Sequence, residues 1–425
     1  MEIILSGRNT NSIYFKLCFI LVSLFVIING ISPYNINKYF VLFVITIFIS
    51  LLNCNELKKI TYYILPLVTI LHGYIILMIL LLLIVKSKSL NKYQILPTIL
   101  LLTIETIHFL THGDLSSFSN FIYYSSCIAL FFYILFDNKN DSIENISLFC
   151  YGTSLILFIV SYNMITTFGI SDVLNGMHRD GSIMGSNEGE NIIRVALNAN
   201  SVGYLSIAVI TLLFIGKEDL KIPSLIYVLL FAICIFAGII SFSRAWMIMI
   251  LFSLIAYIFL KKDLISKKIF LIISVSLLAL LVSSTEIIQI IYDSFYNRFI
   301  ADDIETVGNR TSISNNYIEY LNNNKDAWIW GRGTIGSQSI SNITVHNGTL
   351  QVIISYGIIG IFVYLLSFIM YFKKYNLNKV SKILYIPFIV CFIEIQTLQF
   401  LSPPFLMFPI LVSLMALKTY KKHER

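Results

Sequence analysis

Residues 345–351 read Val345-His346-Asn347-Gly348-Thr349-Leu350-Gln351, and they close a polar interval that covers 284–347. Directly after them the chain becomes apolar again, through Tyr356-Gly357-Ile358-Ile359-Gly360. The interval interrupts a chain that is otherwise almost continuously apolar. It therefore separates two groups of candidate membrane spans. A histidine at the start of an apolar segment, next to a loop that carries arginines, is where we expect chemistry.

The composition is typical of an integral membrane protein. Hydrophobic residues make up 57% of the chain and charged residues 12%, and the mean hydropathy is +0.81. Soluble domains carry about 25% charged residues. Because a spanning segment must satisfy its own backbone hydrogen bonds, and these runs do not alternate as barrel strands do, we expect helices. The chain is predicted to be an all-α polytopic membrane protein, with 1–425 as a single integral membrane domain.

We expect about 12 to 13 transmembrane helices, each long enough to cross a hydrocarbon core of about 30 Å. The candidate spans are 14–31, 39–53, 61–85, 93–111, 118–136, 146–168, 197–215, 223–241, 244–260, 268–283, 349–371, 384–400 and 403–417. The last two form one apolar run that Ser402-Pro403-Pro404 should break, since proline cannot continue a helix. The first run lacks a small-residue cleavage site, so we interpret it as a retained span.

Lysine clusters predict the orientation of the spans. The clusters lie at 217–221, 261–268, 373–382 and 418–422. The positive-inside rule places them in the cytoplasm, which puts two polar loops, 169–196 and 284–347, on the outer side. The N-terminal third fits less well, because counting back from Lys86 leaves Lys58 and Lys59 outside unless one early segment is re-entrant. The net charge of +7 reflects this topology and does not indicate a nucleic-acid partner.

The outer loop 284–347 contains two stretches with apolar residues at helical spacing. The first stretch has Ile287, Ile288, Ile291, Phe295 and Phe299, and the second has Ile313, Tyr317, Tyr320 and Leu321. We predict that both form amphipathic helices that lie on the membrane surface or cover a cavity. Thr311 or Ser312 is the expected cap of the second helix.

Arginine follows a different distribution from lysine. Six of the eight arginines fall on the predicted outer side, namely Arg179, Arg194, Arg244, Arg298, Arg310 and Arg332. Outward-facing cations are uncommon in short loops. A guanidinium holds phosphate through two hydrogen bonds and keeps its charge when it is partly desolvated. An outer-leaflet pyrophosphate is therefore one candidate ligand, and ion pairs with nearby acids or contacts with lipid headgroups are the alternative.

Arg244 and His346 are the sharpest candidates. Ser241-Phe242-Ser243-Arg244 forms the whole connection between two predicted spans, so Arg244 should lie at the outer rim of the membrane, where ionisable residues mark a substrate path. A neutral imidazole at His346 could accept a proton or donate a hydrogen bond to a phosphate oxygen. The alternative for His346 is a residue at the membrane interface or a helix cap.

Ionisable residues within the spans allow other interpretations. Glu105 and His108 lie on one helical face, which favours a hydrogen-bonded pair, because a di-iron site would need a second Glu-x-x-His motif. We therefore predict no metal. Glu105 and Glu394 could also serve a proton path, which keeps a secondary transporter possible. Gly357 and Gly360 are interpreted as a close helix contact.

Four landmarks follow one another along 179–371. They are Arg179-Asp180-Gly181 before Asn198-Ala199-Asn200, the turn Ser241-Phe242-Ser243-Arg244, Asn309-Arg310 before Trp330-Gly331-Arg332-Gly333, and His346-Asn347 before Gly357-Ile358-Ile359-Gly360. In this order they resemble the motifs of the O-antigen polymerase and O-antigen ligase superfamily of bacterial membrane glycosyltransferases. Two departures matter. Ala199 stands where the family has proline, which should loosen the helix start. The insertion 185–191 leaves open whether Arg194 replaces Arg179.

The resemblance implies a fold similar to the GT-C membrane glycosyltransferases, without a cofactor or metal. The donor is then an undecaprenyl-diphosphate-linked oligosaccharide at the outer face of the bacterial inner membrane. In that mechanism an acceptor hydroxyl attacks the anomeric carbon and the lipid diphosphate leaves. Arg244, Arg310 and one of Arg179 and Arg194 hold the diphosphate, Asn198 and Asn200 bind substrate, and His346 is the catalytic base or donor.

Polymerase and ligase share this chemistry and differ in the acceptor, which is another lipid-linked repeat unit or the lipid A core. We favour the polymerase, with the ligase as the alternative and a secondary transporter as a third interpretation. A transporter should show repeated halves with broken helices and a binding site near the membrane midplane. The expected partners are the lipid-linked oligosaccharide, membrane lipid, a chain-length regulator and a flippase. The active site should face the periplasm.

Overall fold

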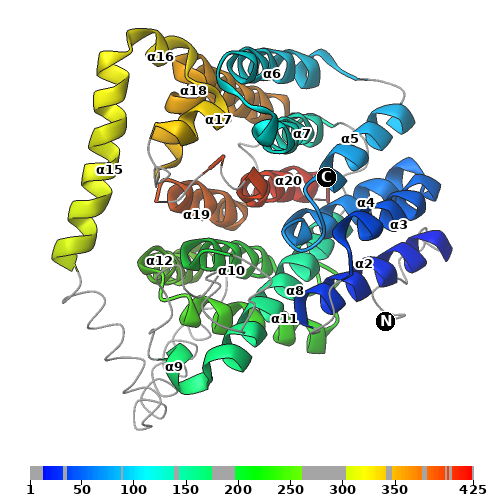
Figure 1. Cartoon of the computed structure of the whole chain (residues 1–425). Coiled ribbons are helices and arrows are strands. Elements are labelled where there is room, and N and C mark those ends of the chain that lie inside the picture. Colours follow the sequence, from blue (N-terminus) through cyan, green and yellow to red (C-terminus); the bar gives the residue numbers. More distant parts are fainter. Residues whose placement is uncertain are drawn as a thin grey trace.

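The computed structural model describes residues 13–31, 36–87, 90–137, 143–174, 197–260, 303–340, 347–375, 381–397, 400–401 and 404–423. These residues form helices joined by short connections, and none of them forms a strand (Figure 1). The predicted all-α architecture is confirmed. The predicted span 268–283 and the first amphipathic stretch, 287–299, lie outside the described residues.

The described elements are α-helices and short 3-10 helices. Their bounds are α2 (Ile13–Ile31), α3 (Lys38–Leu51), α4 (Cys54–Ile64), η1 (Leu65–Leu67), α5 (Tyr74–Ser87), α6 (Lys92–His112), η2 (Leu115–Ser117), α7 (Phe118–Leu135), α8 (Ile143–Phe168), α9 (Ile170–Leu174), α10 (Ala199–Leu213), α11 (Ser224–Ile240), α12 (Arg244–Leu260), α15 (Asp303–Asn323), α16 (Lys325–Trp330), α17 (Gly333–Ser339), α18 (Gly348–Tyr375), η6 (Lys382–Leu384), α19 (Tyr385–Ile395), η7 (Pro404–Met407) and α20 (Phe408–His423).

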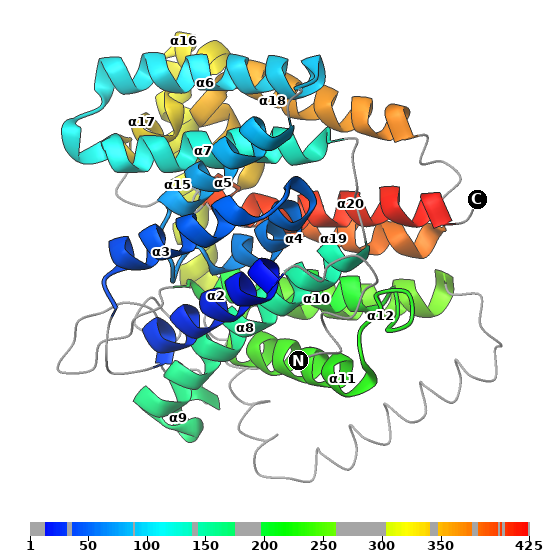
Figure 2. The ribbon, with the colours of Figure 1, turned by 90° about the vertical axis from the view of Figure 1, so that its right-hand side faces the viewer.

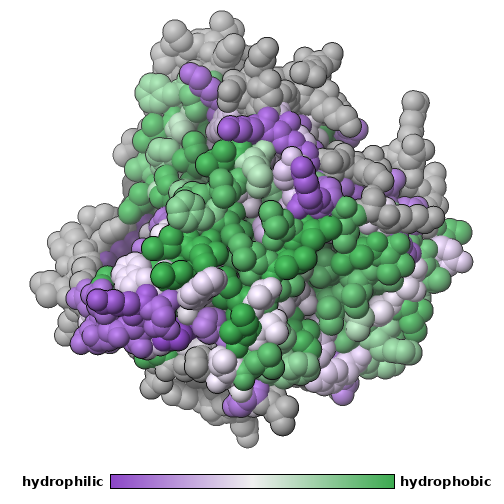
Figure 3. Space-filling view, turned by 90° about the horizontal axis from the view of Figure 1, so that it is seen from above, coloured by the Kyte–Doolittle hydropathy of each residue, from purple (hydrophilic) through white to green (hydrophobic). Residues whose placement is uncertain are grey.

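Five of the described helices, α2, α6, α7, α8 and α18, are long and apolar enough to cross a membrane, and α3, α5, α10, α11 and α12 are shorter apolar helices. Figure 2 shows that the axes of α6, α7, α10, α18 and α20 are roughly parallel. The outside of the bundle is apolar as well, with Leu96 72% and Phe362 60% exposed, and Figure 3 shows a wide hydrophobic surface. A soluble protein would bury such a surface. The chain is a multi-pass membrane protein.

The predicted span 61–85 is wrong, because two elements occupy this stretch. Helix α4 begins already at Cys54, η1 contains Pro66, and α5 starts only at Tyr74. Between them the ring of His72 packs on Tyr39, at the start of α3, and on Tyr74, with 4.8 Å between ring centroids in each case. The chain therefore crosses the bundle once through α4 and η1 and returns through α5.

This extra crossing decides the position of Lys58, which the span count placed outside unless one early segment is re-entrant. Lys58 of α4 forms an ion pair with Asp137, just after α7, and the side chains of both are largely buried. Lys86 of α5 donates hydrogen bonds to the carbonyls of Ser50, at 2.7 Å, and of Leu52. Lys58 therefore lies at the same end of the bundle as Lys86, and not on the opposite side.

The same end of the bundle gathers further lysines. Lys59 forms an ion pair with Glu144 at the start of α8. Lys418 of α20 donates to the backbone carbonyl of Asp137 at 2.6 Å, and the ammonium of Lys374 near the end of α18 lies over the ring of Tyr375. We call this the lysine end, made of Lys58, Lys59, Lys86, Lys374 and Lys418. The positive-inside rule predicts that it faces the cytoplasm.

A kink interrupts α18 and receives another segment of the chain. Gly357 has non-helical angles, φ 63° and ψ −164°. A Cβ atom at Gly357 would lie 2.1 Å from the carbonyl oxygen of Ile329, and one at Gly331 would lie 2.3 Å from the carbonyl of Ser355. The backbone N–H of Arg332 donates to the carbonyl of Ile354 at 2.8 Å. The α16–α17 connection therefore lies directly on the kink, as Figure 1 shows for these helices.

The glycine pair was predicted to mark a close helix contact, and this holds for Gly357. Gly360 is different, because the nearest atom to an added Cβ is the Cβ of Tyr356 in the same helix, at 2.4 Å. The described contacts of Gly360 thus reflect the local bend. Glycine is needed at 357 for contact with another segment and at 360 for the kink itself.

The second predicted amphipathic helix exists, with a different start. Helix α15 begins at Asp303, so Thr311 and Ser312 lie inside it and do not cap it. Tyr317 and Leu321 are buried in a small cluster with Ala327 of α16 and Ile354 of α18, whereas Ile318 is 41% exposed. Figure 1 shows α15 at one edge of the molecule, apart from the main bundle, with α16 at its end.

Replacement of Gly357 by alanine tests the kink. A non-glycine residue with left-handed backbone angles costs about 1–2 kcal/mol, and the contact with Ile329 adds overpacking of about 1–3 kcal/mol. We expect Gly357→Ala to lower the thermal unfolding temperature of the purified protein by several degrees. Gly336→Ala is the control, because the nearest atom to its Cβ is the Arg332 Cβ at 3.3 Å. Equal melting temperatures for the two variants would contradict the proposed role of Gly357.

Candidate active site at the arginine end

The turn before α12 fixes the first residue of that helix, Arg244. The Ser241 hydroxyl donates to the carbonyl of Gly238 at 2.7 Å and accepts from the N–H of Ser243 at 3.3 Å. Phe242 has φ +46°, which a bulky residue adopts only when its surroundings hold it there, and its side chain is buried. Arg244 follows this constrained turn and is partly buried. Its backbone position is therefore well defined, as predicted.

Helices α10, α11 and α12 pack around Trp246, one turn inside α12. The indole N–H donates to Ser206 of α10 at 3.0 Å, and the Ser206 hydroxyl donates to the carbonyl of Cys234 of α11 at 2.6 Å. The indole ring lies against Gly238, and Gly203 of α10 lies against Ser243 and Trp246, so closely that an added Cβ would clash at both glycines. This contact brings the start of α10 to the Arg244 turn.

Asn198 and Asn200 lie at the start of α10. Asn198 is the N-cap residue, and its side-chain oxygen accepts from the N–H of Asn200 at 2.7 Å. Helix α10 therefore begins regularly at Ala199, and the expectation that Ala199 loosens the helix start is wrong. A side-chain cap supplies the acceptor that the first helical N–H groups need. Asn198 is an exposed residue, at the same end of the bundle as Arg244.

The start of α18 reaches the same end. The Asn347 side chain caps the helix by accepting from the N–H of Leu350 at 2.8 Å. The Thr349 hydroxyl donates to the side-chain oxygen of Gln396, just after α19, at 2.6 Å, and Gly348 lies against the carbonyl of Ile395. We call this end the arginine end, made of Arg244, Asn198, Asn200 and the first turn of α18.

A buried acid connects α6 to the α16–α17 segment. Glu105 is 2% exposed, and its carboxylate accepts from the backbone N–H of Thr334 at 2.8 Å and from the Thr334 hydroxyl. An added Cβ at Gly333 would lie 2.8 Å from a Glu105 oxygen and 2.9 Å from the Cβ of His108. Glu105 and His108 share one face of α6, as predicted, but both carboxylate oxygens of Glu105 accept hydrogen bonds from Thr334.

A second buried acid lies in the last turn of α19. Glu394 is 1% exposed, and neither of its carboxylate oxygens makes a hydrogen bond to any other described residue. It lies close enough to Tyr204 of α10 and Cys391 of α19 for electrostatic interaction. A buried ionisable group without hydrogen bonds is costly in a protein interior, which favours a functional role.

Asp114 is a third acid, between α6 and α7 and outside the spans. It accepts from the hydroxyl of Ser117 at 2.6 Å, from the hydroxyl of Ser116 at 2.7 Å and from the N–H of Ser117 at 2.8 Å. These hydrogen bonds, that of the Ser117 hydroxyl above all, lower the pKa of Asp114 to about 2. The carboxylate is therefore ionised at neutral pH, which excludes it as a general acid.

Arg332 pairs with residues near it in the chain, which was the alternative to a pyrophosphate ligand. Its Nε donates to the hydroxyl of Tyr320 at 2.8 Å, its guanidinium lies 3.1 Å from a carboxylate oxygen of Asp326, and its carbon lies 5.8 Å from the centre of the Tyr320 ring. The side chain joins α15 to α16. We assign Arg332 a structural role within the segment α15–α17.

The structure describes part of the predicted site. His346, Arg179, Arg194 and Arg298 lie outside the described residues, and for Arg310 only the backbone position within α15 is described. Arg244 lies at the start of α12, and Asn198 and Asn200 lie at the start of α10, at the same end of the bundle. The predicted roles of these residues stay predictions. The contact between Glu105 and Thr334 was not predicted, although an acid within an apolar span was a signal that Glu105 has a polar partner.

A double-mutant cycle tests the connection between Glu105 and Thr334. Glu105→Ala leaves the Thr334 N–H buried without its acceptor, which costs about 1–3 kcal/mol, and Thr334→Ala removes only the hydroxyl bond. We expect a coupling free energy of about 0.5–3 kcal/mol from the unfolding of the two single variants and the double variant. Additive effects would mean that the two side chains do not stabilise one another. Ser337→Ala, in the same helix, is the control for changes in α17 alone.

The comparison with protein families found one match. Residues 229–365, about a third of the chain, match the family described as O-antigen ligase. The matched region runs from within α11 through the Arg244 turn, α12 and the segment α15–α17 to the middle of α18. Neither the comparison with curated proteins nor that with solved structures found a match. The family match indicates a membrane enzyme of the glycosyltransferase type, and it confirms the predicted similarity of this chain to the O-antigen ligase and polymerase superfamily.

Proposed function

We propose that this protein is a surface-polysaccharide polymerase of the bacterial inner membrane. It transfers an undecaprenyl-diphosphate-linked glycan onto the terminal sugar of another lipid-linked repeat unit, with the active site on the periplasmic side. The observation that carries this proposal is that the region similar to O-antigen ligase contains the Arg244 turn, the α15–α17 segment and the start of α18. In the structure the Arg244 turn and the start of α18 belong to one end of the bundle.

The proposed reaction needs a cationic site for the diphosphate. The acceptor hydroxyl attacks the anomeric carbon of the donor sugar, the bond from that carbon to the phosphate oxygen breaks, and the polyprenyl diphosphate leaves with the bonding electrons. Arg244, Arg310 and one of Arg179 and Arg194 stabilise the charge that develops on the diphosphate. His346 accepts the proton of the acceptor hydroxyl or donates to the leaving phosphate.

The asparagines at the start of α10 suit contact with the sugar. The Asn198 oxygen caps α10, and an amide side chain also carries an NH₂ group, which would donate to a sugar hydroxyl or a phosphate oxygen. Asn200 is half-buried one position into the helix. The amphipathic α15, which packs on α16 and α18 through Tyr317 and Leu321, would cover the glycan and exclude water, which favours transfer over hydrolysis.

A secondary transporter is the second candidate, and Glu394 is the observation that favours it. A buried carboxylate without a hydrogen bond is the kind of group that a proton-coupled carrier protonates. The broken α18 is also a transporter feature. However, the chain itself occupies the break at Gly357, because the backbone N–H of Arg332 donates a hydrogen bond to the Ile354 carbonyl. Glu394→Gln separates the candidates, because it should abolish proton-coupled transport and is not required for the proposed glycosyl transfer.

Deletion of the gene tests the proposed function through the surface glycolipids. A polymerase deletion should leave a single repeat unit on the lipid A core, whereas a ligase deletion should leave the core without glycan. Gel separation of the extracted glycolipids distinguishes these patterns. A glycolipid ladder that is unchanged by the deletion would contradict both the polymerase and the ligase.

Replacement of Arg244 tests the diphosphate site. We expect Arg244→Ala to lower the rate of glycan elongation by at least about 100-fold, since loss of a group that stabilises transition-state charge costs about 2.7–4 kcal/mol. Arg332→Ala is the matched control, because its ion pair with the exposed Asp326 is of a kind that contributes about 0–1 kcal/mol. Elongation is measured in cells with equal amounts of each variant. Full activity of Arg244→Ala would remove this residue from the mechanism.

A further inference from the structure

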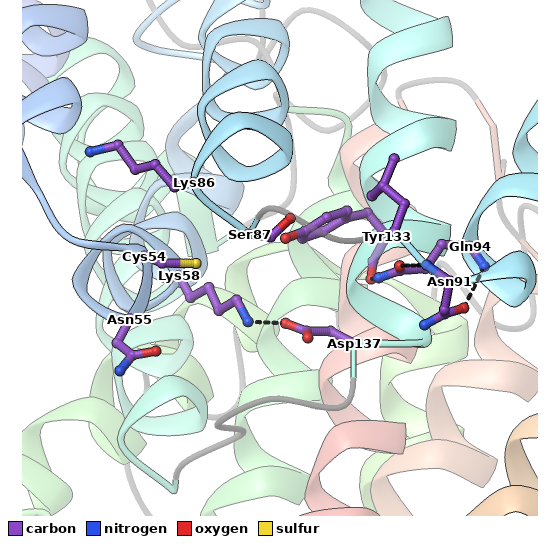
Figure 4. Close-up of a pocket in the computed structure, with 10 residues that line it drawn as sticks. Cys54, Asn55, Lys58, Lys86, Ser87, Asn91, Gln94, Tyr133 and Asp137 are labelled. Carbon is purple, nitrogen blue, oxygen red and sulfur yellow. Dashed lines mark hydrogen bonds and ion pairs between the residues drawn. The ribbon is translucent and has the colours of Figure 1, made fainter.

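Helix α5 is tied to α3 at both of its ends, by a different kind of side chain at each. At the lysine end, Figure 4 shows the side chain of Lys86 pointing away from the pocket drawn there. Its ammonium donates instead to the carbonyls of Ser50, at 2.7 Å, and Leu52, where α3 ends. At the opposite end of α5, the ring of His72 packs on Tyr39 in the first turn of α3.

The His72 side chain also caps α5. We call residues 68–73, which join η1 to α5, the His72 turn. The backbone N–H of Tyr74, the first residue of α5, donates to Nδ1 of His72 at 3.2 Å, and the N–H of Ile75 donates to the His72 carbonyl at 3.0 Å. The first N–H groups of a helix have no acceptor inside it, so such partners stabilise its start. His72 thus has the capping role that Asn, Asp or Ser has in most helices.

This cap requires a neutral imidazole. A neutral ring has one nitrogen that accepts and one that carries hydrogen, and here Nδ1 accepts, so the hydrogen is on Nε2. A second proton would bind at Nδ1, the atom toward which the Tyr74 N–H points. The charged ring has two donors and no acceptor, so that N–H would lose its partner. Protonation of His72 therefore removes the side-chain cap of α5.

The groups around His72 oppose its protonation. The ammonium of Lys38, the first residue of α3, repels a charged imidazole, and so do the partly positive N–H groups at the start of α5. Burial of the ring, and Lys38 after it, lower the pKa of His72 from its usual value of 6.5. No acid among the described residues offsets this effect. The rings of Tyr39 and Tyr74 attract a cation, but this attraction does not restore the cap.

The His72 turn lies between three helices and is accessible. A Cβ atom at Gly73 would lie 3.0 Å from the ring of Tyr123 in α7, so the turn packs on α7 as well as on α3. His72 is half-buried and Tyr39 is 65% exposed. Because the turn lies opposite the lysine end, the positive-inside rule predicts that it faces outward. Protons from the outer side would therefore reach the imidazole.

We propose that the His72 turn is a pH-sensitive joint on the outer side of the bundle, in which protonation of His72 releases the start of α5 from the start of α3. The joint is closed while the imidazole is neutral and opens in mildly acidic surroundings. Histidine is the side chain whose ordinary titration falls between about pH 5 and 8. The bonds of Lys86 keep the other end of α5 in place while its start moves. This joint does not depend on the proposed enzymatic function.

Hydrogen–deuterium exchange of the full-length purified protein at about pH 7.5 and about pH 5 tests the joint. Protection factors are compared, since they remove the intrinsic effect of pH on exchange. We expect the peptide that covers 74–76 to lose protection at least about threefold at the lower pH, because the closed turn binds the neutral imidazole. A peptide from the middle of α8 should keep its protection. Equal protection of 74–76 at both pH values would overturn the proposal.

His72→Asn removes the titration and keeps the cap, because the amide oxygen of asparagine caps a helix and does not take up a proton in this pH range. We expect this variant to protect 74–76 equally at both pH values. Lys86→Met is the matched control, since it breaks the bonds at the other end of α5 and leaves His72 in place. Its loss of protection at 74–76 on acidification should equal that of the wild type. A loss as large in His72→Asn as in the wild type would contradict the joint, as would its absence in Lys86→Met.

The melting temperature gives a second measurement. Because the pKa of His72 is lowered in the folded protein, its contribution to stability is complete above about pH 6.5 and is lost as the pH falls toward the folded value. The wild type should therefore lose stability relative to His72→Asn on acidification, and a difference that does not change with pH would overturn the proposal. Lys38→Met, which keeps His72, serves if His72→Asn folds poorly. At low ionic strength it should raise the pH at which 74–76 loses protection, and an unchanged or lower pH would contradict the assignment to His72.

Discussion

The contact between the α16–α17 connection and the kink of α18 organises the described part of this protein. In a bilayer, a break in a helix exposes backbone groups that water cannot reach, and each such group costs several kcal/mol without a partner. Here the chain supplies the partner itself, as the N–H of Arg332 bonds the carbonyl of Ile354. Gly331 and Gly357 permit the approach, because any side chain at either position would overlap the opposite backbone.

This contact also explains why a polar segment lies within an apolar bundle. The start of α17 has backbone N–H groups without a partner inside that helix. Glu105 of α6 accepts hydrogen bonds there from the N–H and the hydroxyl of Thr334. Tyr317 and Leu321 then fix α15 against the same corner of the bundle. The segment between α12 and α18 is thus fixed to the bundle through several independent contacts, which gives the predicted arginine site a defined framework.

The two ends of the bundle differ in chemistry. At the lysine end, ammonium groups bond backbone carbonyls and the acids Asp137 and Glu144. At the arginine end, asparagine caps, the strained turn at Phe242 and the guanidinium of Arg244 lie at helix starts, where backbone N–H groups favour anions. This polarity fits a protein that handles a phosphate-bearing substrate at the arginine end.

Local sequence patterns predicted the helices well where apolar runs were separated by polar residues. Helix α12 begins at Arg244 as expected, and the spacing of Tyr317 and Leu321 correctly predicted a helix. The prediction of one span over 61–85 is wrong because Pro66 and Gly73 lie within this run, which has apolar residues on both sides of them. The partner of Glu105 lies 229 residues away along the chain, and no local pattern predicts such a contact. At the start of α10, Ala199 stands where the family resemblance predicts proline, and the side chain of Asn198 caps the helix.

Reconstitution of the purified protein in liposomes tests the central claim most directly. The liposomes contain a polyprenyl-diphosphate-linked repeat unit as the only sugar donor and acceptor. The products to be measured are the elongated lipid-linked glycan and the released polyprenyl diphosphate. We expect one polyprenyl diphosphate to be released for each repeat unit that is added to the lipid-linked glycan, and only in the presence of the protein. Absence of polyprenyl diphosphate release, with the repeat unit or with a lipid A core acceptor, would contradict it.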